Sequence, residues 1–192
     1  MRSPGRLIVL SGPSGVGKTT VGQAVLKGRR DRVRSVSATT RPRRRRERHG
    51  RDYLFLTEKA FEALRRRNGF LEHAVVHGFR YGTPRAPVLK ALAKEKDVLL
   101  VIDVQGARQV RRSFPDALFL FLAPPSTAAL KARLAGRRTE DREALRRRLS
   151  AARREMKERK RYDHVLVNDR LQDTVRSLRA LLRASSRGRA RL

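Results

Sequence analysis

The hydrophobic positions of this chain fall into short continuous runs, separated by longer stretches in which charged residues dominate. The clearest runs are residues 7–10, 98–102 and 117–122, and residues that typically begin a helix follow each of them. A strand that is apolar at every position fits a parallel sheet covered on both faces, because neither of its faces meets water. Repeated alternation of such strands with helices predicts an α/β fold, in which a parallel sheet carries helices on both faces.

Weaker signals predict the remaining elements. Thr57 is a typical N-cap, with Glu58 in the first turn of the helix that follows. Residues 78–84 contain two glycines and a proline, and they predict a turn that leads into a helix ending near Lys96. The further expected strands are 33–38, 53–56, 70–77 and 164–167, and the further expected helices are 19–28, 58–68, 140–160 and 171–184.

The segment after the first strand carries the most specific motif. Residues 12–19 read GPSGVGKT and match G-x-x-x-x-G-K-[ST] at every fixed position, between a strand and a helix as this phosphate-binding loop requires. Glycines let backbone N–H groups turn toward a polyphosphate, and the helix N-terminus favours the same anion. Lys18 is expected to reach the β- and γ-phosphates of ATP, and the Thr19 hydroxyl to hold Mg²⁺. The predicted ATP-binding residues here are Gly12, Pro13, Ser14, Gly15, Val16, Gly17, Lys18, Thr19 and Thr20.

Length and composition narrow the class of protein. A chain of 192 residues suits one α/β domain with small inserted subdomains, and the absence of cysteine excludes disulfides and thiolate metal sites. No apolar run approaches the length of a membrane span, and the first run ends too early for a signal peptide. We therefore expect a soluble, cytoplasmic protein without membrane attachment.

The net charge of +30 fits attraction to anionic ligands, and nonspecific nucleic-acid binding needs only such charge. The arginines are spread along the whole chain, however, which a general bias toward arginine on solvated faces would also produce. The chain has no tryptophan and few aromatic residues, so it lacks the stacking platforms that proteins use to bind single strands.

Candidate chemistry beyond the loop lies at Asp103 and in the middle third of the chain. Asp103 ends an apolar strand, so a parallel sheet would bring it to the edge that carries the loop, where it could orient Mg²⁺-bound water; a simple cap residue is the alternative. The arginine-rich segment 41–51 could bind phosphate oxygens or be a solvated basic loop. Glu72 could accept from the two adjacent N–H donors of a base such as guanine, while Ser37 or Thr83 could donate to its O6.

Together these motifs resemble those of guanylate kinases, in the family's order and over nearly the whole chain. The resemblance implies transfer of the γ-phosphoryl group of ATP to GMP, giving ADP and GDP, with Mg²⁺. dGMP is a further candidate acceptor, whose use the sequence leaves open. The motifs that carry it are GPSGVGKT at 12–19, SVSATTR at 35–41, GRDY at 50–53, FLE at 70–72, YGT at 81–83, IDVQG at 102–106, FLAPPS at 121–126, LAGR at 134–137 and VND at 167–169.

The resemblance also implies roles for individual residues. Arg137 and Arg148 would reach from a lid to the transferring phosphates and, with Lys18 and Arg41, form the catalytic cations. Asn168 would lie near the adenine, and Asp103 would contact Mg²⁺ through water. The implied GMP site comprises Ser37, Arg41, Arg44, Glu47, Tyr53, Glu72, Tyr81, Thr83 and Asp103.

Two positions depart from the family pattern. The family usually reads T-R-x-P-R-x-G-E, whereas here Pro42 comes one position early and Arg46 stands where glycine is expected. Arg43 or Arg45 could therefore replace Arg44 at the GMP phosphate. Val101 stands where many members carry a further carboxylate, which leaves Asp103 alone.

We expect one domain over residues 1–184, and a monomer or a small homo-oligomer. A phosphotransferase for a sugar phosphate or another nucleotide, an inactive binding domain of the same fold, and a nucleic-acid-binding protein are the alternatives. The expected parts are a core of 1–36, 85–125 and 162–184, a GMP-binding insert of 37–84, a helical lid of 126–161 and a basic, disordered tail of 185–192.

Overall fold

A computed structural model describes residues 5–76, 78–135 and 142–187 of the chain. Its main sheet contains five strands, all parallel, in the order β2-β7-β1-β8-β9. The first strand therefore lies at the centre, and the residues that follow it emerge in the middle of the carboxyl edge of the sheet. The strands are β1 (Leu7–Ser11), β2 (Arg32–Arg34), β7 (Asp97–Val101), β8 (Leu118–Ala123) and β9 (His164–Val167).

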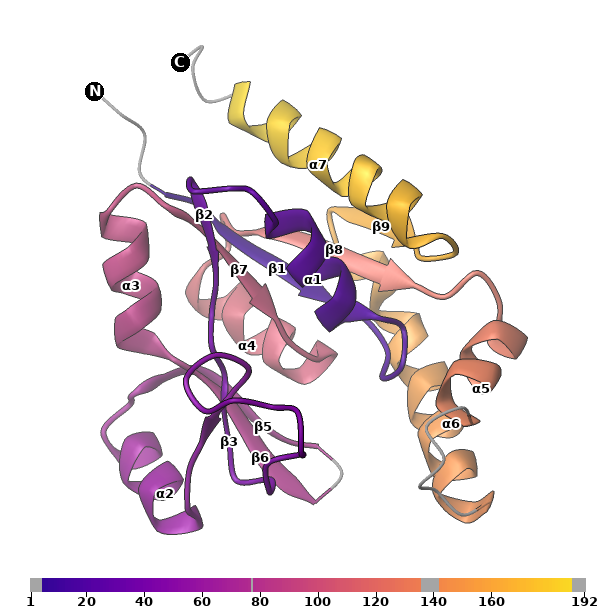
Figure 1. The fold of residues 1–192 in the computed structure, drawn as a ribbon, viewed down its shortest axis with the longest axis horizontal. Coiled ribbons are helices and arrows are strands. Elements are labelled where there is room, and N and C mark those ends of the chain that lie inside the picture. Colours follow the sequence, from indigo (N-terminus) through magenta and orange to yellow (C-terminus); the bar gives the residue numbers. More distant parts are fainter. Residues whose placement is uncertain (1–4, 77, 136–141, 188–192) are drawn as a thin grey trace.

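Helices cover both faces of the main sheet, as the apolar strands predict (Figure 1). Alternate residues of β1 point to opposite faces, so Leu7 and Val9 pack on one side and Ile8 and Leu10 on the other. The helices α3 (Arg85–Ala93) and α4 (Val104–Ser113) lie on the first side, and α1 (Lys18–Leu26) and α7 (Leu171–Arg187) lie on the second.

A second, smaller sheet of mixed direction lies below the carboxyl edge of the main sheet in Figure 1, in the order β4-β3-β6-β5. Helix α2 (Glu58–Arg66) packs on this sheet through Phe61, whose ring stacks on Phe70 at 4.5 Å. Thr57 caps that helix as predicted, with its hydroxyl accepting from the Ala60 N–H at 3.2 Å. The strands are β3 (Ala38–Thr39), β4 (Leu54–Phe55), β5 (Phe70–Val76) and β6 (Phe79–Pro84).

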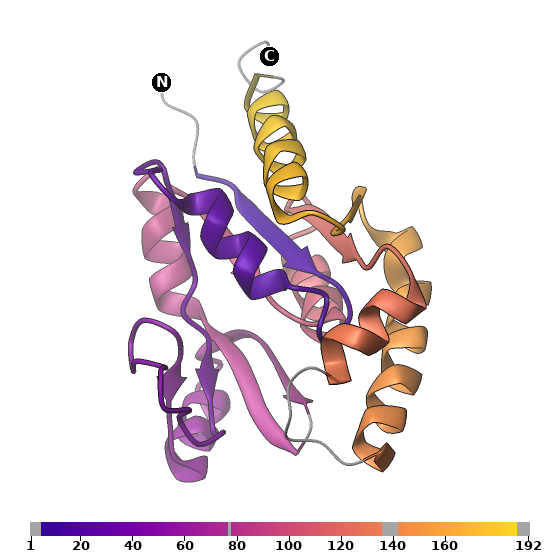
Figure 2. The ribbon, with the colours of Figure 1, turned by 45° about the vertical axis from the view of Figure 1, so that its right-hand side comes forward.

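Two further helices stand beside the carboxyl edge, across from the second sheet (Figure 2). These are α5 (Thr127–Ala135) and α6 (Arg142–Lys157), and a short 3₁₀ turn over Glu158–Arg161 continues α6. Leu130 and Leu134 of α5 pack against Ala152 of α6. The helix predicted over 140–160 is thus observed from Arg142, and its first two residues lie outside the described part of the chain.

Two predicted elements are wrong in detail. The strand expected over 33–38 is divided, because β2 leaves the main sheet after Arg34 and the chain enters the second sheet only at Ala38. Residues 79–84, expected to form a turn, are strand β6, and only Gly78 has the left-handed backbone of a turn, with φ 82°. Gly82 lies inside this strand, where its packing favours glycine, because a Cβ atom at this position would come within 2.8 Å of the Phe70 ring.

Helix α7 extends to Arg187, so the first three residues of the segment expected as a tail are helical. None of the helices in the part of the chain that the structure describes is long and apolar enough to cross a membrane.

Candidate active site

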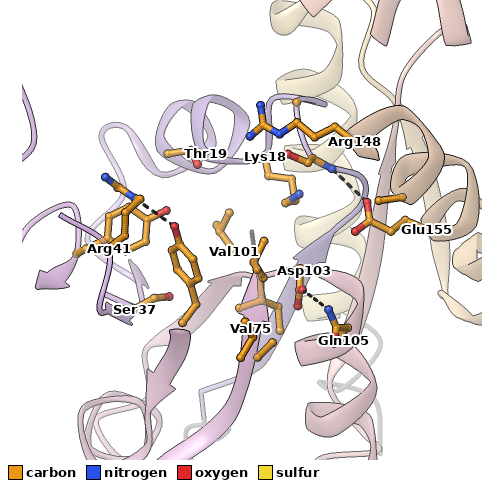
Figure 3. Close-up of a pocket in the computed structure, with 18 of the residues that line it drawn as sticks. Lys18, Thr19, Ser37, Arg41, Val75, Val101, Asp103, Gln105, Arg148 and Glu155 are labelled. Atoms are coloured by element: carbon orange, nitrogen blue, oxygen red, sulfur yellow. Dashed lines mark hydrogen bonds between the residues drawn. The ribbon is translucent and has the colours of Figure 1, made fainter. Parts of the chain in front are cut away.

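A cavity of about 400 Å³ opens at the carboxyl edge of β1 and β7. Its walls come from the loop after β1, from the second sheet and from helix α6, so segments far apart in sequence meet around it (Figure 3). The predicted residues that line it are Ser14, Gly15, Gly17, Lys18, Thr19, Thr20, Ser37, Arg41, Arg44, Tyr53, Glu72, Tyr81, Asp103 and Arg148.

The glycine-rich loop has the backbone shape of a phosphate-binding loop. Gly12, Gly15 and Gly17 all have positive φ angles, of 142°, 82° and 97°. Gly12 also passes so close to β8 that a Cβ atom there would lie 2.2 Å from the Leu122 carbonyl oxygen. Lys18 folds back over the loop, where its ammonium donates to the carbonyl oxygens of Gly12 at 2.6 Å and Pro13 at 3.0 Å. The positive φ angles are of the kind that lets successive backbone N–H groups turn toward one anion, and Lys18 lies across the loop.

Asn168 supports this loop from behind and does not line the cavity. Its Nδ2 donates to the Val16 carbonyl oxygen at 2.8 Å, and its Oδ1 accepts from the Thr174 hydroxyl at 3.0 Å. A Cβ atom at Gly17 would lie 2.7 Å from Nδ2. The buried asparagine thus ties the C-terminal part of the fold to the phosphate loop, a contact that nothing in the sequence indicates.

Glu155 of helix α6 is a lining residue that sequence analysis missed. Figure 3 shows its side chain directed toward the phosphate loop, where Oε2 accepts from the Ser14 N–H at 3.3 Å. Burial raises the pKa of this carboxyl, and the nearby positive charge of Lys18 opposes the rise. Because Glu155 lies within a helix in which most residues are charged, the sequence pattern does not distinguish it from its solvated neighbours.

Arg41 stands at the opposite end of the cavity in a network with three other groups. Its guanidinium pairs with Glu47 at 2.8 Å and donates through Nε to the Tyr81 hydroxyl at 3.1 Å. It also lies 5.6 Å from the centre of the Tyr53 ring. Burial acts to raise the pKa of Glu47, but its hydrogen bonds to Arg41 and to the Arg44 backbone N–H outweigh burial and lower it. The carboxylate thus fixes the orientation of a cation beside two hydroxyl groups.

The structure separates the three arginines that the sequence leaves as alternatives. The side chain of Arg44 lines the cavity, whereas Arg43 donates to the backbone carbonyl of Glu47 at 3.1 Å. Arg45 is exposed and is not part of the cavity wall.

Glu72 and Thr83 form a buried pair on the floor of the cavity. The two residues are opposite each other on β5 and β6, and the Thr83 hydroxyl donates to Glu72 Oε1 at 2.6 Å. Only 4% of Glu72 is exposed, and burial raises the pKa of its carboxyl to about 7 against the effect of the Thr83 hydrogen bond, with the negative charge of Asp103 adding to the rise. Thr83 is not part of the cavity wall, and it affects the cavity through its hydrogen bond to Glu72.

Asp103 is the cap residue that the sequence analysis gave as the alternative, and it also lies in the cavity wall. It is the N-cap of α4, with Oδ1 accepting from the Gly106 N–H at 2.8 Å, and it also lines the cavity. Its position next to the end of β7 places it between the loop and the second sheet, as the parallel topology predicts.

The charges of the cavity are arranged in two cationic ends with carboxylates between them. Figure 3 shows Lys18 and Arg148 at one end, Arg41 at the other, and Asp103 below them. Such an arrangement can bind two anionic groups at the ends of one cavity and a neutral hydrogen-bond donor on its floor.

Some predicted residues lie elsewhere. Gly12, Pro13, Val16, Glu47, Thr83 and Asn168 support the cavity from behind its wall, and Arg137 lies outside the described residues. Within the described ranges, no group of three or more His, Cys, Asp or Glu side chains could hold a metal ion by itself.

A family model and the sequence relatives point to the same protein family. The sequence model described as guanylate kinase matches residues 4–185. The chain is 50% identical over 183 residues to a guanylate kinase of Thermobifida fusca, covering 95% of this chain and 93% of that one. It is 47% identical to a guanylate kinase of Thermus thermophilus, over 98% of this chain and 85% of that one.

A solved structure agrees with the sequence relatives. The fold is similar to the crystal structure of guanylate kinase from Anaplasma phagocytophilum, with a TM-score of 0.81, 34% identity, and coverage of 96% of this chain and 87% of that one. The match extends over the phosphate loop, the second sheet and the helices beside them, and the chain belongs to the guanylate kinase family.

Proposed function

We propose that the two ends of the cavity divide the reaction of this guanylate kinase, ATP + GMP giving ADP + GDP, with ATP on the phosphate loop and GMP against the second sheet. The buried Glu72–Thr83 pair is the observation that carries this assignment. Burying an ionised carboxylate costs free energy unless both of its oxygens find hydrogen-bond donors. Thr83 supplies a donor to one oxygen of Glu72, and the other oxygen faces a cavity large enough for a ligand.

At the GMP end, recognition of the base follows from hydrogen-bond polarity. Glu72 accepts from N1–H and the exocyclic amine of guanine, and Ser37, which also lines the cavity, donates toward O6. Thr83 holds the carboxylate in place through the 2.6 Å hydrogen bond. Arg41, Arg44 and the hydroxyl groups of Tyr53 and Tyr81 bind the phosphate, with Glu47 orienting Arg41.

At the ATP end, the backbone N–H groups of residues 14–19 and the N-terminus of α1 bind the β- and γ-phosphates. The Lys18 ammonium, which now donates to Gly12 and Pro13, moves to the phosphates as they enter. Asn168 acts on ATP through the loop backbone that it supports.

The donor set also fits Mg²⁺, because this ion is commonly held by one or two protein oxygens together with substrate phosphates. Thr19 and Asp103 line the same cavity and offer a hydroxyl and a carboxylate. Thr19 would hold the ion directly and Asp103 through water, and the bound ion would neutralise charge on the phosphates.

Catalysis requires positioning and charge neutralisation more than proton transfer. The nucleophile is an oxygen of the GMP phosphate, which is already anionic, so no strong general base is needed. Lys18, Arg41 and Arg148 surround the polyanionic transition state with positive charge, and Arg137 would add to them from the segment outside the described residues. The helices α5 and α6 act as the lid, and the second sheet as the GMP-binding insert.

The test is a coupled assay of ADP production with GMP, dGMP, AMP and a sugar phosphate as acceptors. We expect GMP to be preferred over AMP by about 10³-fold in kcat/KM, because adenine presents a lone pair to Glu72 and leaves the buried carboxylate unpaired. Lys18→Ala is the negative control and should lower the rate with GMP by about 10² to 10³. Equal use of AMP or of the sugar phosphate would contradict the guanylate assignment and leave only a phosphotransferase of this fold.

A further inference from the structure

Gly106 is the third residue of helix α4 and lies against Glu72 of strand β5. A Cβ atom at this position would lie 2.4 Å from Glu72 Oε2, 2.9 Å from Glu72 Cδ and 3.3 Å from Asp103 Oδ1. The carboxylate of Glu72 therefore occupies the space that any side chain at position 106 would fill.

This glycine is not required by its backbone. Gly106 has no positive φ angle and lies inside a regular helix, where glycine is less favourable than alanine by about 1 kcal/mol. Its N–H donates to Asp103 Oδ1 at 2.8 Å, a bond that any residue except proline could make. What glycine alone provides at this position is space, and Glu72 is the group that uses it.

The other neighbours of Glu72 leave its carboxylate little freedom. Thr83 holds Oε1 at 2.6 Å and is itself fully buried. Asp103, the N-cap residue of α4, brings a second negative charge to the same floor. Oε2 is left between Gly106 and the cavity, so a methyl group at position 106 would push it toward the space that the acceptor base needs.

We propose that Gly106 is a positioning residue for acceptor selectivity: its missing side chain lets Glu72 present its carboxylate at the depth and angle that the guanine edge requires. This inference rests on the proposed function of the same cavity. Gly106 touches no reacting atom, and it acts through Glu72.

The effect of Gly106→Ala on acceptor selectivity can be separated from an effect on folding. The atoms nearest the added methyl group belong to the Glu72 carboxylate and not to backbone, so the strain falls on this carboxylate and on its hydrogen bond with Thr83. Gly106→Ala should fold, with helix propensity in its favour. A displaced carboxylate should lower kcat/KM for GMP by about 10²-fold, since a misplacement of about 1 Å in a site can cost that much. The KM for ATP should stay within about twofold, and the preference for GMP over AMP should fall by a similar factor of about 10².

The experiment is a double-substitution cycle on the full-length protein with Gly106→Ala, Glu72→Ala and the combination of both. If the methyl group acts through Glu72, adding Gly106→Ala to Glu72→Ala leaves kcat/KM for GMP and for AMP unchanged within about twofold. Arg112→Ala, on an exposed position of the same helix, is the control for substitutions in α4 and should match the wild type.

Three results would overturn the inference. Gly106→Ala could keep the GMP preference of the wild type, it could raise the KM for ATP as much as that for GMP, or it could lower activity further in the Glu72→Ala background. If Gly106→Ala alone proves unstable, the combined variant still decides, because the clash with the carboxylate is absent there. A wild type without preference for GMP would instead contradict the proposed function, so the two failures are distinguishable.

Discussion

At Glu72, burial favours the neutral carboxyl, whereas the proposed function requires the ionised form. Its carboxyl has a pKa of about 7, because burial raises it further than the Thr83 hydrogen bond lowers it. To accept from guanine it must be ionised, since the protonated acid would present a donor to a donor. If Glu72 has the proposed function, the unliganded protein near pH 7 is a mixture of a form that can accept from guanine and a form that cannot.

Acceptor use should therefore depend on pH. We expect kcat/KM for GMP to fall about tenfold for each pH unit below 7, because this parameter reports the ionisation of the free enzyme. Glu72→Gln should have a low kcat/KM for GMP at every pH and should lack this additional decrease. The GMP phosphate itself also changes its ionisation with pH, and this change affects both proteins equally. An identical decrease of kcat/KM at low pH in the wild type and in Glu72→Gln would therefore contradict the role of Glu72.

The same ionisation should affect stability. The pKa of Glu72 rises from 4.5 in the unfolded chain to about 7 in the folded one, so its contribution to stability is fully present below pH 4.5 and is lost as the pH rises through 7. A shift of roughly 2.5 pH units corresponds to about 3 kcal/mol. Without nucleotide, Glu72→Gln should raise the free energy of unfolding at pH 8 by about this amount, and at pH 4.5 by little.

Denaturant unfolding of the two proteins at several pH values measures this difference. Groups other than Glu72 titrate in both proteins and cancel in the comparison. A stability difference that did not change with pH would mean that the carboxyl ionises in the folded protein as it does in water.

At the scale of elements, the cavity depends on where three units meet: the loop before α1, the second sheet, and helices α5 and α6. Glu155 joins α6 to the loop through the Ser14 N–H, and Arg148, about two turns earlier on the same face of that helix, lines the cavity with it. The elements were largely predictable where residues are apolar at every position, as in β1 and β8. They were less predictable for β6, because two glycines and a proline in residues 78–84 suggested a turn, whereas pairing with β5 decided the structure.

Helices α5 and α6 should move toward the second sheet when both substrates bind. Positive charge on both sides of the cavity opposes closure in the free protein, and the phosphates of ATP and GMP remove that repulsion. We expect a smaller radius of gyration in solution scattering with unreactive analogues of both nucleotides than with either alone. Equal scattering curves in all states would contradict a lid formed by these helices.

At the scale of the whole molecule, the net charge of +30 is spread over the surface and not gathered at the cavity alone. Exposed arginines occur on the loop before β4, on α2, on α6 and on α7. The sequence has no tryptophan and its aromatic content is 5%, so it offers few side chains on which bases could stack.

Binding of nucleic acid should therefore be nonspecific and sensitive to salt. We expect duplex DNAs of unrelated sequence to bind with equal affinity at 50 mM salt. Their affinity should fall by about 10³-fold or more at 200 mM salt, because counterion release supplies the binding energy. Fluorescence anisotropy over this range tests the expectation. Binding that discriminates between sequences and persists at 200 mM salt would show a dedicated nucleic-acid site.

The local sequence by itself determined the phosphate loop and the apolar strands. These depend on short-range patterns, such as the glycines and Lys18 of residues 12–19, or on continuous apolar runs that only a buried strand satisfies. The motif order also predicted that Glu72, Ser37 and Asp103 share a site, and the structure brings all three to one cavity.

Only the tertiary structure decided the contacts made between distant segments. It placed Arg44 and not Arg43 in the cavity wall, set Asn168 behind the loop, and brought Glu155 against Ser14. It also gave Gly106 its neighbour, because the space beside a helix depends on the strand that packs there. The raised pKa of Glu72 has the same origin, since burial is a property of the folded surroundings and not of the residue.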